Sequence, residues 1–195
     1  VVQTCALPIS SDAAERSGRD RLRLRNTTRP VDELARDDRA LLLRNAFLDT
    51  SLGTDLEIPE HLRAAEEPGS FVVQSAGPIT EAFRSLVTGA GGTVVSYLPN
   101  NAFLVSATRA QADTLRGRAG VAAVLPFEPY FKLEPALLDL AVERKPLDAS
   151  TRLNLTLLPG TRDAAVEGIR AQGAEVLSEF RTPFGPGLVV EPVGD

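Results

Sequence analysis

The side chains best suited to chemistry are few and lie apart along the chain. His61 is the single histidine, and it falls in the polar stretch IPEHLR. A Ser-His-Asp triad or a zinc site would require this residue, but nothing nearby resembles a nucleophile elbow or a second ligand. We predict that His61 is a solvated linker residue.

Two pairs of adjacent carboxylates, Asp37-Asp38 and Glu66-Glu67, are the other candidates for acid and base chemistry. Paired acids can serve as general acid and general base. Both pairs lie in polar runs, however, where adjacent acids are typical of solvated surface. We predict no catalysis at either pair.

Two further patterns resemble binding or modification sites. Gly89, Gly91 and Gly92 could suggest a phosphate-binding loop, but they follow a predicted helix instead of opening one, so no helix N-terminus would face a phosphate. Asn26 and Asn154 each begin an N-glycosylation pattern, which is common by chance. We therefore expect no catalytic, cofactor-binding or metal-binding residue, and we expect the function to lie in surfaces.

The two ends of the sequence carry little information about the fold. Val2 to Ile9 reads VQTCALPI, which is the in-frame translation of GTT CAG ACG TGT GCT CTT CCG ATC and resembles a common sequencing-library adapter. We interpret residues 1–9 as an artefact and exclude them, and with them Cys5, the only cysteine. That reading excludes disulfides and thiolate metal sites. We expect the natural N-terminus to be missing, so the lack of a signal peptide does not bear on export.

The composition narrows the class of protein. Hydrophobic residues make up 43% of the chain, charged residues 24%, and the formal net charge is −5. No apolar run approaches the roughly 18 residues of a membrane span, and no basic stripe indicates nucleic acid as a partner. We expect a soluble protein that binds neither membranes nor nucleic acids.

The first part of the chain, residues 10–68, is predicted to be a charged, partly helical segment and linker. Residues 11–29 are almost all charged or small and polar, a composition typical of a mobile segment. Leucines and alanines then recur among charges, which predicts a helix over Val31–Leu48. The stretch IPEHLRAAEEPGS is the expected linker.

From residue 69 the apolar pattern sharpens. FVVQSA predicts a strand, and the next run has helical spacing and ends at Gly91-Gly92. TVVSYL and NAFLVSAT predict two strands joined by a Pro-Asn-Asn turn. Thr108 and Gln111 form a capping box for a second helix, and VAAVL is the last strand. The order β-α-β-β-α-β predicts a ferredoxin-like unit over residues 69–133.

After a linker at residues 134–150 the same order begins again. RLNLTLL predicts a strand, Thr161 is a candidate helix N-cap, and GAEVLSEF and GLVVEP parallel GGTVVSY and AFLVSA. We expect residues 151–195 to be a second similar unit, incomplete before its second helix and fourth strand. The predicted fold class is α+β, with tandem ferredoxin-like units of which the second is truncated.

Each predicted unit has helices for one face of its sheet only. A helix pair buries itself against one face, and the other face is then expected to stay free. A free antiparallel face is a natural docking surface, although many such faces simply meet water.

Three phrases in the first unit resemble the N-terminal propeptide region of secreted subtilisin-like serine peptidases. They are FVVQSAGPI, then YLPNNAFLV, then the run from Val121 to Leu133 that contains PFEPYFKL. LLLRNAFLDT and IPEHLRA are also similar to this family, so the resemblance covers residues 40–195. It implies a propeptide that acts as an intramolecular folding chaperone and inhibitor of a downstream catalytic domain in a secreted protein, with no cofactor. An extended tail of such a propeptide would lie in the protease cleft by strand addition.

The chain departs from this family in two respects. The catalytic signatures D-[ST]-G, H-G-T and G-T-S-x-A are absent from the sequence, so the fragment itself is expected not to be an enzyme, although its parent would be a serine endopeptidase. The first unit is followed by a second unit and not by a protease. Two alternatives therefore stay open: a non-catalytic interaction module of an extracellular protein, and a small-molecule-binding regulatory domain.

Overall fold

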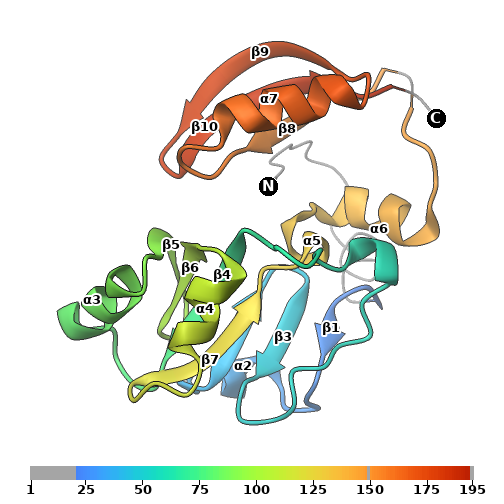
Figure 1. The fold of residues 1–195 in the computed structure, drawn as a ribbon. Helices are drawn as coiled ribbons and strands as arrows, with labels where there is room; N and C mark the ends of the chain where they lie inside the picture. The colour runs from blue at the N-terminus through green and yellow to red at the C-terminus, as the bar shows by residue number, and fades with distance from the viewer. Residues whose placement is uncertain (1–20, 149, 194–195) are drawn as a thin grey trace. The chain divides into compact units, whose positions relative to one another are not determined.

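The computed structural model describes residues 21–148 and 150–193 and has a mixed α+β architecture (Figure 1). The chain forms two compact units. One is Arg21–Phe131, and the described part of the other runs from residue 132 to residue 193.

The first unit is built around a four-stranded antiparallel sheet with the strand order β5-β6-β4-β7. Apolar residues that alternate along β4 and β6 bury one face of the sheet against two helices, where Phe71, Phe103 and Val105 meet Phe83 and Val87. The elements are β4 (Ser70–Ser75), α3 (Glu81–Gly89), β5 (Thr93–Leu98), β6 (Ala102–Ser106), α4 (Arg109–Leu115) and β7 (Val121–Pro126).

Local signals in the sequence set the limits of these helices. The Thr108 side chain accepts from Gln111 N while Gln111 Oε1 accepts from Thr108 N, so the predicted capping box is confirmed. The hydroxyl of Thr80 accepts from Phe83 N at the start of α3. That helix ends before Gly91, which has a φ of 87°, so the predicted stop is also confirmed.

The predicted helix over Val31–Leu48 is wrong. Only α2 (Val31–Leu34) is helical, and a hairpin follows, made of β2 (Ala40–Leu43) and β3 (Ala46–Asp49). Leucines spaced seven apart suit a helix, but the segment also contains two short continuous apolar runs, ALLL and AFL, which are typical of buried strands, and they are separated by a turn at Arg44-Asn45. The two patterns could not be separated without the tertiary partner of this segment.

Residues 21–29 are also more structured than their composition predicted. Strand β1 (Leu24–Arg25) pairs in parallel with β3, and Arg23 and Arg25 lie over the ring of Phe47 at 4.5 and 5.0 Å from its centroid. Cation–π contacts of this kind offset the scarcity of apolar residues. Residues 11–20, and residues 1–9 with Cys5, lie outside the described residues.

The second unit contains a three-stranded antiparallel sheet with the order β8-β10-β9 and a helix, α7, on one face. Leu155, Leu188 and Val190 of the sheet form a buried cluster with Val166 of the helix. Helix α6 also occupies part of the predicted linker at residues 134–150. The elements are α6 (Pro135–Glu143), β8 (Leu153–Thr156), α7 (Arg162–Ala171), β9 (Glu175–Thr182) and β10 (Gly185–Glu191). The first unit also contains a 3-10 turn, η1 (Glu60–Leu62), and it ends within α5 (Pro129–Lys132).

Candidate interaction surfaces

The second face of the four-stranded sheet, which the sequence predicted to be free, is covered. Val72 and Gln74 of β4 and Ala102 and Leu104 of β6 point away from α3 and α4, yet each is at most 7% exposed. Hydrogen bonds from this face reach the chain between Leu34 and Thr50. The expectation of a free face is wrong for the first unit, because the N-terminal segment forms its own layer there.

Gln74 is the central polar group under this layer and is fully buried. Its Nε2 lies 3.1 Å from both Asp38 O and Ala40 O and 3.0 Å from Asn100 O. Its Oε1 lies 2.6 Å from the hydroxyl of Thr50. A buried amide costs little only when its donors and acceptors are satisfied, so Gln74 specifies where the segment lies.

The Pro-Asn-Asn turn of the β5–β6 hairpin also binds the covering segment, near Leu34 and Asp38. Asn100 and Asn101 have φ values of 63° and 62°, a left-handed conformation that asparagine tolerates. Asn100 Nδ2 donates to Leu34 O and Asp37 O, both at 3.0 Å, and Asn101 Nδ2 donates to Asp38 Oδ1 at 2.9 Å. These asparagines therefore shape the turn and bind the N-terminal layer together.

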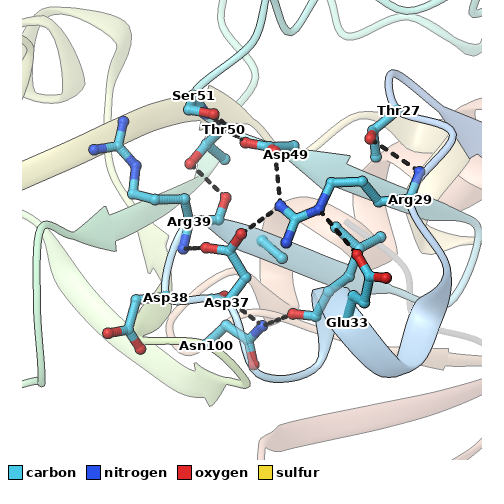
Figure 2. Close-up of polar contacts among 12 residues, drawn as sticks. Thr27, Arg29, Glu33, Asp37, Asp38, Arg39, Asp49, Thr50, Ser51 and Asn100 are labelled. Carbon is cyan, nitrogen blue, oxygen red and sulfur yellow. Dashed lines mark hydrogen bonds and ion pairs between the residues drawn. The ribbon is translucent and has the colours of Figure 1, made fainter.

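An ion cluster of Arg29, Asp37 and Asp49 ties the layer together (Figure 2). Arg29 Nη1 donates to Asp37 Oδ2 and, at 3.1 Å, to Asp49 Oδ2. The hydrogen bond from Arg29 and then that from Arg39 N hold the pKa of Asp37 below its usual range. The hydrogen bond from the hydroxyl of Ser51 contributes most to lowering the pKa of Asp49. Both acids are thus ionised at neutral pH. Through Arg29 they join the chain that precedes α2 to Asp37 and to Asp49 at the end of β3.

The residues that the sequence singled out do not come together as a reactive site. Asp37 belongs to the ion cluster, whereas Glu67 accepts from Arg109 N at 3.0 Å. His61 is exposed in η1. The side chain of Asn26 bonds the backbone of Asp49 and Gly53. Among the described residues, no group of three or more His, Cys, Asp and Glu could hold a metal ion.

The sheet of the second unit differs on its two faces. Leu188 and its ladder partner Glu179 lie on the α7 side, where Glu179 bonds Arg162 of the helix. That contact lowers the pKa of Glu179. The next pair, Val189 with Ser178, therefore points away from α7.

Most side chains on this other side, which we call the open face, are uncharged, and Glu175 and Glu191 form a charged pair at one end of it. The ring of Phe180 lies directly over Gly187, since a Cβ built on that glycine would be 2.3 Å from the ring. The uncharged members of the open face are Asn154, Thr156, Ser178, Phe180, Thr182, Gly187 and Val189.

The helices of the described residues are all too short or too polar to span a membrane.

A family described as a domain of unknown function (DUF8729) matches residues 27–128, just over half of the chain. The chain belongs to this family. No curated protein and no solved structure matches it. The DUF8729 match begins two residues before Arg29 and ends at Glu128, so it contains both the segment 34–50 that covers the sheet and the four-stranded sheet itself. The layer is therefore part of the family's fold.

The N-terminal layer was not predicted from the sequence, although one signal for it was present. Gln74 interrupts the apolar run FVVQSA, and it lies on the face expected to be free. A polar residue buried in a central strand needs a partner. The signal for the ion cluster was weaker, because Arg29, Asp37 and Asp49 are separated along a charged stretch.

Proposed function

We propose that this chain is the propeptide region of a subtilisin-like serine peptidase, where it assists the folding of a catalytic domain of the same protein and inhibits it. The resemblance of residues 40–195 to such propeptides supports the proposal. The parent protein would then be secreted, and the chain itself would perform no chemistry.

The order of elements in both units adds support. The first unit has the order βαββαβ with strands arranged β5-β6-β4-β7, the arrangement expected of a ferredoxin-like unit. The second unit has βαββ with strands arranged β9-β10-β8, which corresponds to the first three strands of that plan. We infer tandem ferredoxin-like units, the second of them incomplete.

The covered face of the first unit restricts how such a propeptide can bind. Gln74 and its neighbours are occupied by residues 34–50, so a partner domain would have to displace a satisfied polar network to reach that face. The open face in the second unit carries mostly uncharged side chains, and Ser178 on it is exposed. We therefore assign docking to the open face.

The covered face also favours a second candidate function. A sheet covered on both sides is suited to be a permanent module, and such a module could serve in adhesion or assembly without inhibiting anything. This alternative predicts no effect on peptidase folding or activity.

The test has two steps. The gene is sequenced beyond the codon for Asp195 and searched for D-[ST]-G, H-G-T and G-T-S-x-A in that order. The catalytic domain found there is then refolded and assayed with and without the complete chain. Higher refolding yield together with slow, saturable inhibition is expected. Absence of the signatures, or peptidase kinetics that do not change at a saturating concentration of the chain, would contradict the proposal. The permanent interaction module would then be the better candidate.

A further inference from the structure

A half-open groove in the first unit combines apolar walls with two arginines. It has a volume of about 310 Å³, at the small end of the range for ligand sites. Leu48, Leu56 and Phe131 are among its lining residues, and Arg63 and Arg116 line it from two different segments. We call it the Arg116 groove.

Both arginines are held in place by the protein and keep one terminal nitrogen for a ligand. Arg63 Nε and Nη2 donate to Ile58 O and Leu56 O, at 3.1 and 2.7 Å. Arg116 Nε and Nη1 donate to Asp113 Oδ1 and Val124 O, both at 2.9 Å. Among the described residues, neither Arg63 Nη1 nor Arg116 Nη2 has a hydrogen-bond partner. Fixed guanidinium groups of this kind are suited to a carboxylate.

The edge of β7 supplies a third donor. Phe127 N donates to Ser70 O, which makes these two residues a hydrogen-bonded pair in the β4–β7 ladder. Because bonded and non-bonded pairs alternate, Val124 directs its N–H and C=O away from β4. The bond from Arg116 to Val124 O agrees with that direction. Val124 N–H therefore lies on the edge that lines the groove.

Two acids, Asp55 and Glu128, also line the groove. Glu128 accepts from Ala64 N and is only 9% exposed, so it is occupied by the backbone. Asp55 is 3.9 Å from Arg63 Nη2, and its side chain is 98% exposed. An exposed pair of this kind is weak and can be displaced.

We propose that the Arg116 groove binds a carboxylate that carries an aliphatic chain, with the carboxylate at the two arginines and the chain against Leu48, Leu56 and Phe131. A free fatty-acid-like anion and the C-terminus of a peptide that ends in an aliphatic residue share this chemistry.

The test is a titration of the complete ¹⁵N-labelled chain with sodium octanoate, followed by amide shifts. Saturable shifts at Leu56, Val124 and Phe131 are expected, and 1-octanol and acetate should not reproduce them. N-acetyl-alanyl-leucine and its C-terminal amide form the second arm. Binding of either carboxylate supports the groove, and the arm in which it occurs identifies the source of the ligand.

Three variants separate a built site from general attraction. Arg116→Gln should weaken octanoate binding about tenfold, the effect of one charge-assisted hydrogen bond. Asp55→Asn should strengthen it about two- to fivefold by freeing Arg63, and it cannot do so by damaging the fold. Glu57→Gln removes a neighbouring exposed acid outside the groove and should change nothing. No saturable shift at 20 mM octanoate (roughly the weakest affinity of interest), or equal effects of Asp55→Asn and Glu57→Gln, would overturn the proposal.

Discussion

The amide of Gln74 and the hydroxyl of Thr50 meet in the interior of the first unit, 2.6 Å apart and 24 residues apart in sequence. The same hydroxyl lies 2.7 Å from Arg39 O. Gln74 belongs to the sheet and Thr50 to the layer that covers it. Through this contact a segment that composition marks as charged and mobile becomes part of the core.

Replacing Gln74 should therefore loosen the layer. Gln74→Ala leaves the buried carbonyl of Ala40 and the hydroxyl of Thr50 without a partner in the sheet. We therefore expect the free energy of unfolding to fall by about 2–4 kcal/mol. Denaturant unfolding followed by tyrosine fluorescence measures this change. Tyr97 and Tyr130 are the only tyrosines and the chain has no tryptophan, so the signal reports the first unit alone.

A matched control is Gln172→Ala, at the exposed end of α7 in the second unit. It should leave the tyrosine transition unchanged within about 0.5 kcal/mol. Equal behaviour of the two variants would show that Gln74 does not anchor the layer.

Asn100 should act in two separable ways. Asn100→Gly keeps the left-handed backbone and loses the side-chain bonds to Leu34 O and Asp37 O, whereas Asn100→Ala loses both. We expect Asn100→Ala to be less stable than Asn100→Gly by about 1 kcal/mol, in the same tyrosine-detected unfolding. A glycine variant as stable as the unmodified chain would mean that the bonds to the layer contribute nothing.

The ion cluster should make the layer sensitive to acid. The pKa values of Asp37 and Asp49 are lowered in the folded chain, so their contribution is present at neutral pH and above the ordinary carboxyl pKa near 4. It is lost as pH falls below about 4, where the unfolded chain takes up protons first. Hydrogen-exchange protection factors of residues 24–49, each referred to the intrinsic exchange rate at the same pH, should be lower at pH 3 than at pH 6 because the layer opens in acid.

Arg29→Gln is the matching variant for this prediction. In this variant the protection factors of residues 24–49 should be lower at pH 6 than in the unmodified chain. They should also differ less between pH 6 and pH 3. An undiminished pH response would assign the acid sensitivity to other carboxylates.

Gly187 should tolerate no side chain while Phe180 covers it. Gly187→Ala places a Cβ where the ring lies, so β10 or the ring must shift, and hydrogen exchange across residues 185–191 should accelerate. In the double variant Gly187→Ala with Phe180→Ala the clash is absent, and exchange should be slower than in Gly187→Ala alone. Additive effects of the two changes would contradict a direct contact.

Local patterns foretold the parts of the fold that depend on near neighbours. The strand predicted from FVVQSA, the Thr108–Gln111 box and the stop at Gly91-Gly92 each depend on residues a few positions apart, and each is found in the structure. The segment 31–48 could not be predicted in this way, because its leucines fit two patterns and the sheet it covers begins 22 residues later. The Arg116 groove was missed for a similar reason, since Arg63 and Arg116 meet only through tertiary structure.

The assignment of docking to the open face depends most directly on one comparison of inhibition. Ser178→Arg adds a long charged side chain to the open face at an exposed position, and Ser85→Arg adds the same group to the exposed side of α3 in the first unit. The inhibition constants of both variants should be measured beside that of the unmodified chain, against the peptidase domain that the proposed function places downstream. We predict that Ser178→Arg weakens inhibition at least about tenfold, a loss of roughly 1.4 kcal/mol, and that Ser85→Arg leaves it unchanged. Loss of inhibition in Ser85→Arg alone, or full inhibition by both, would contradict docking through the open face.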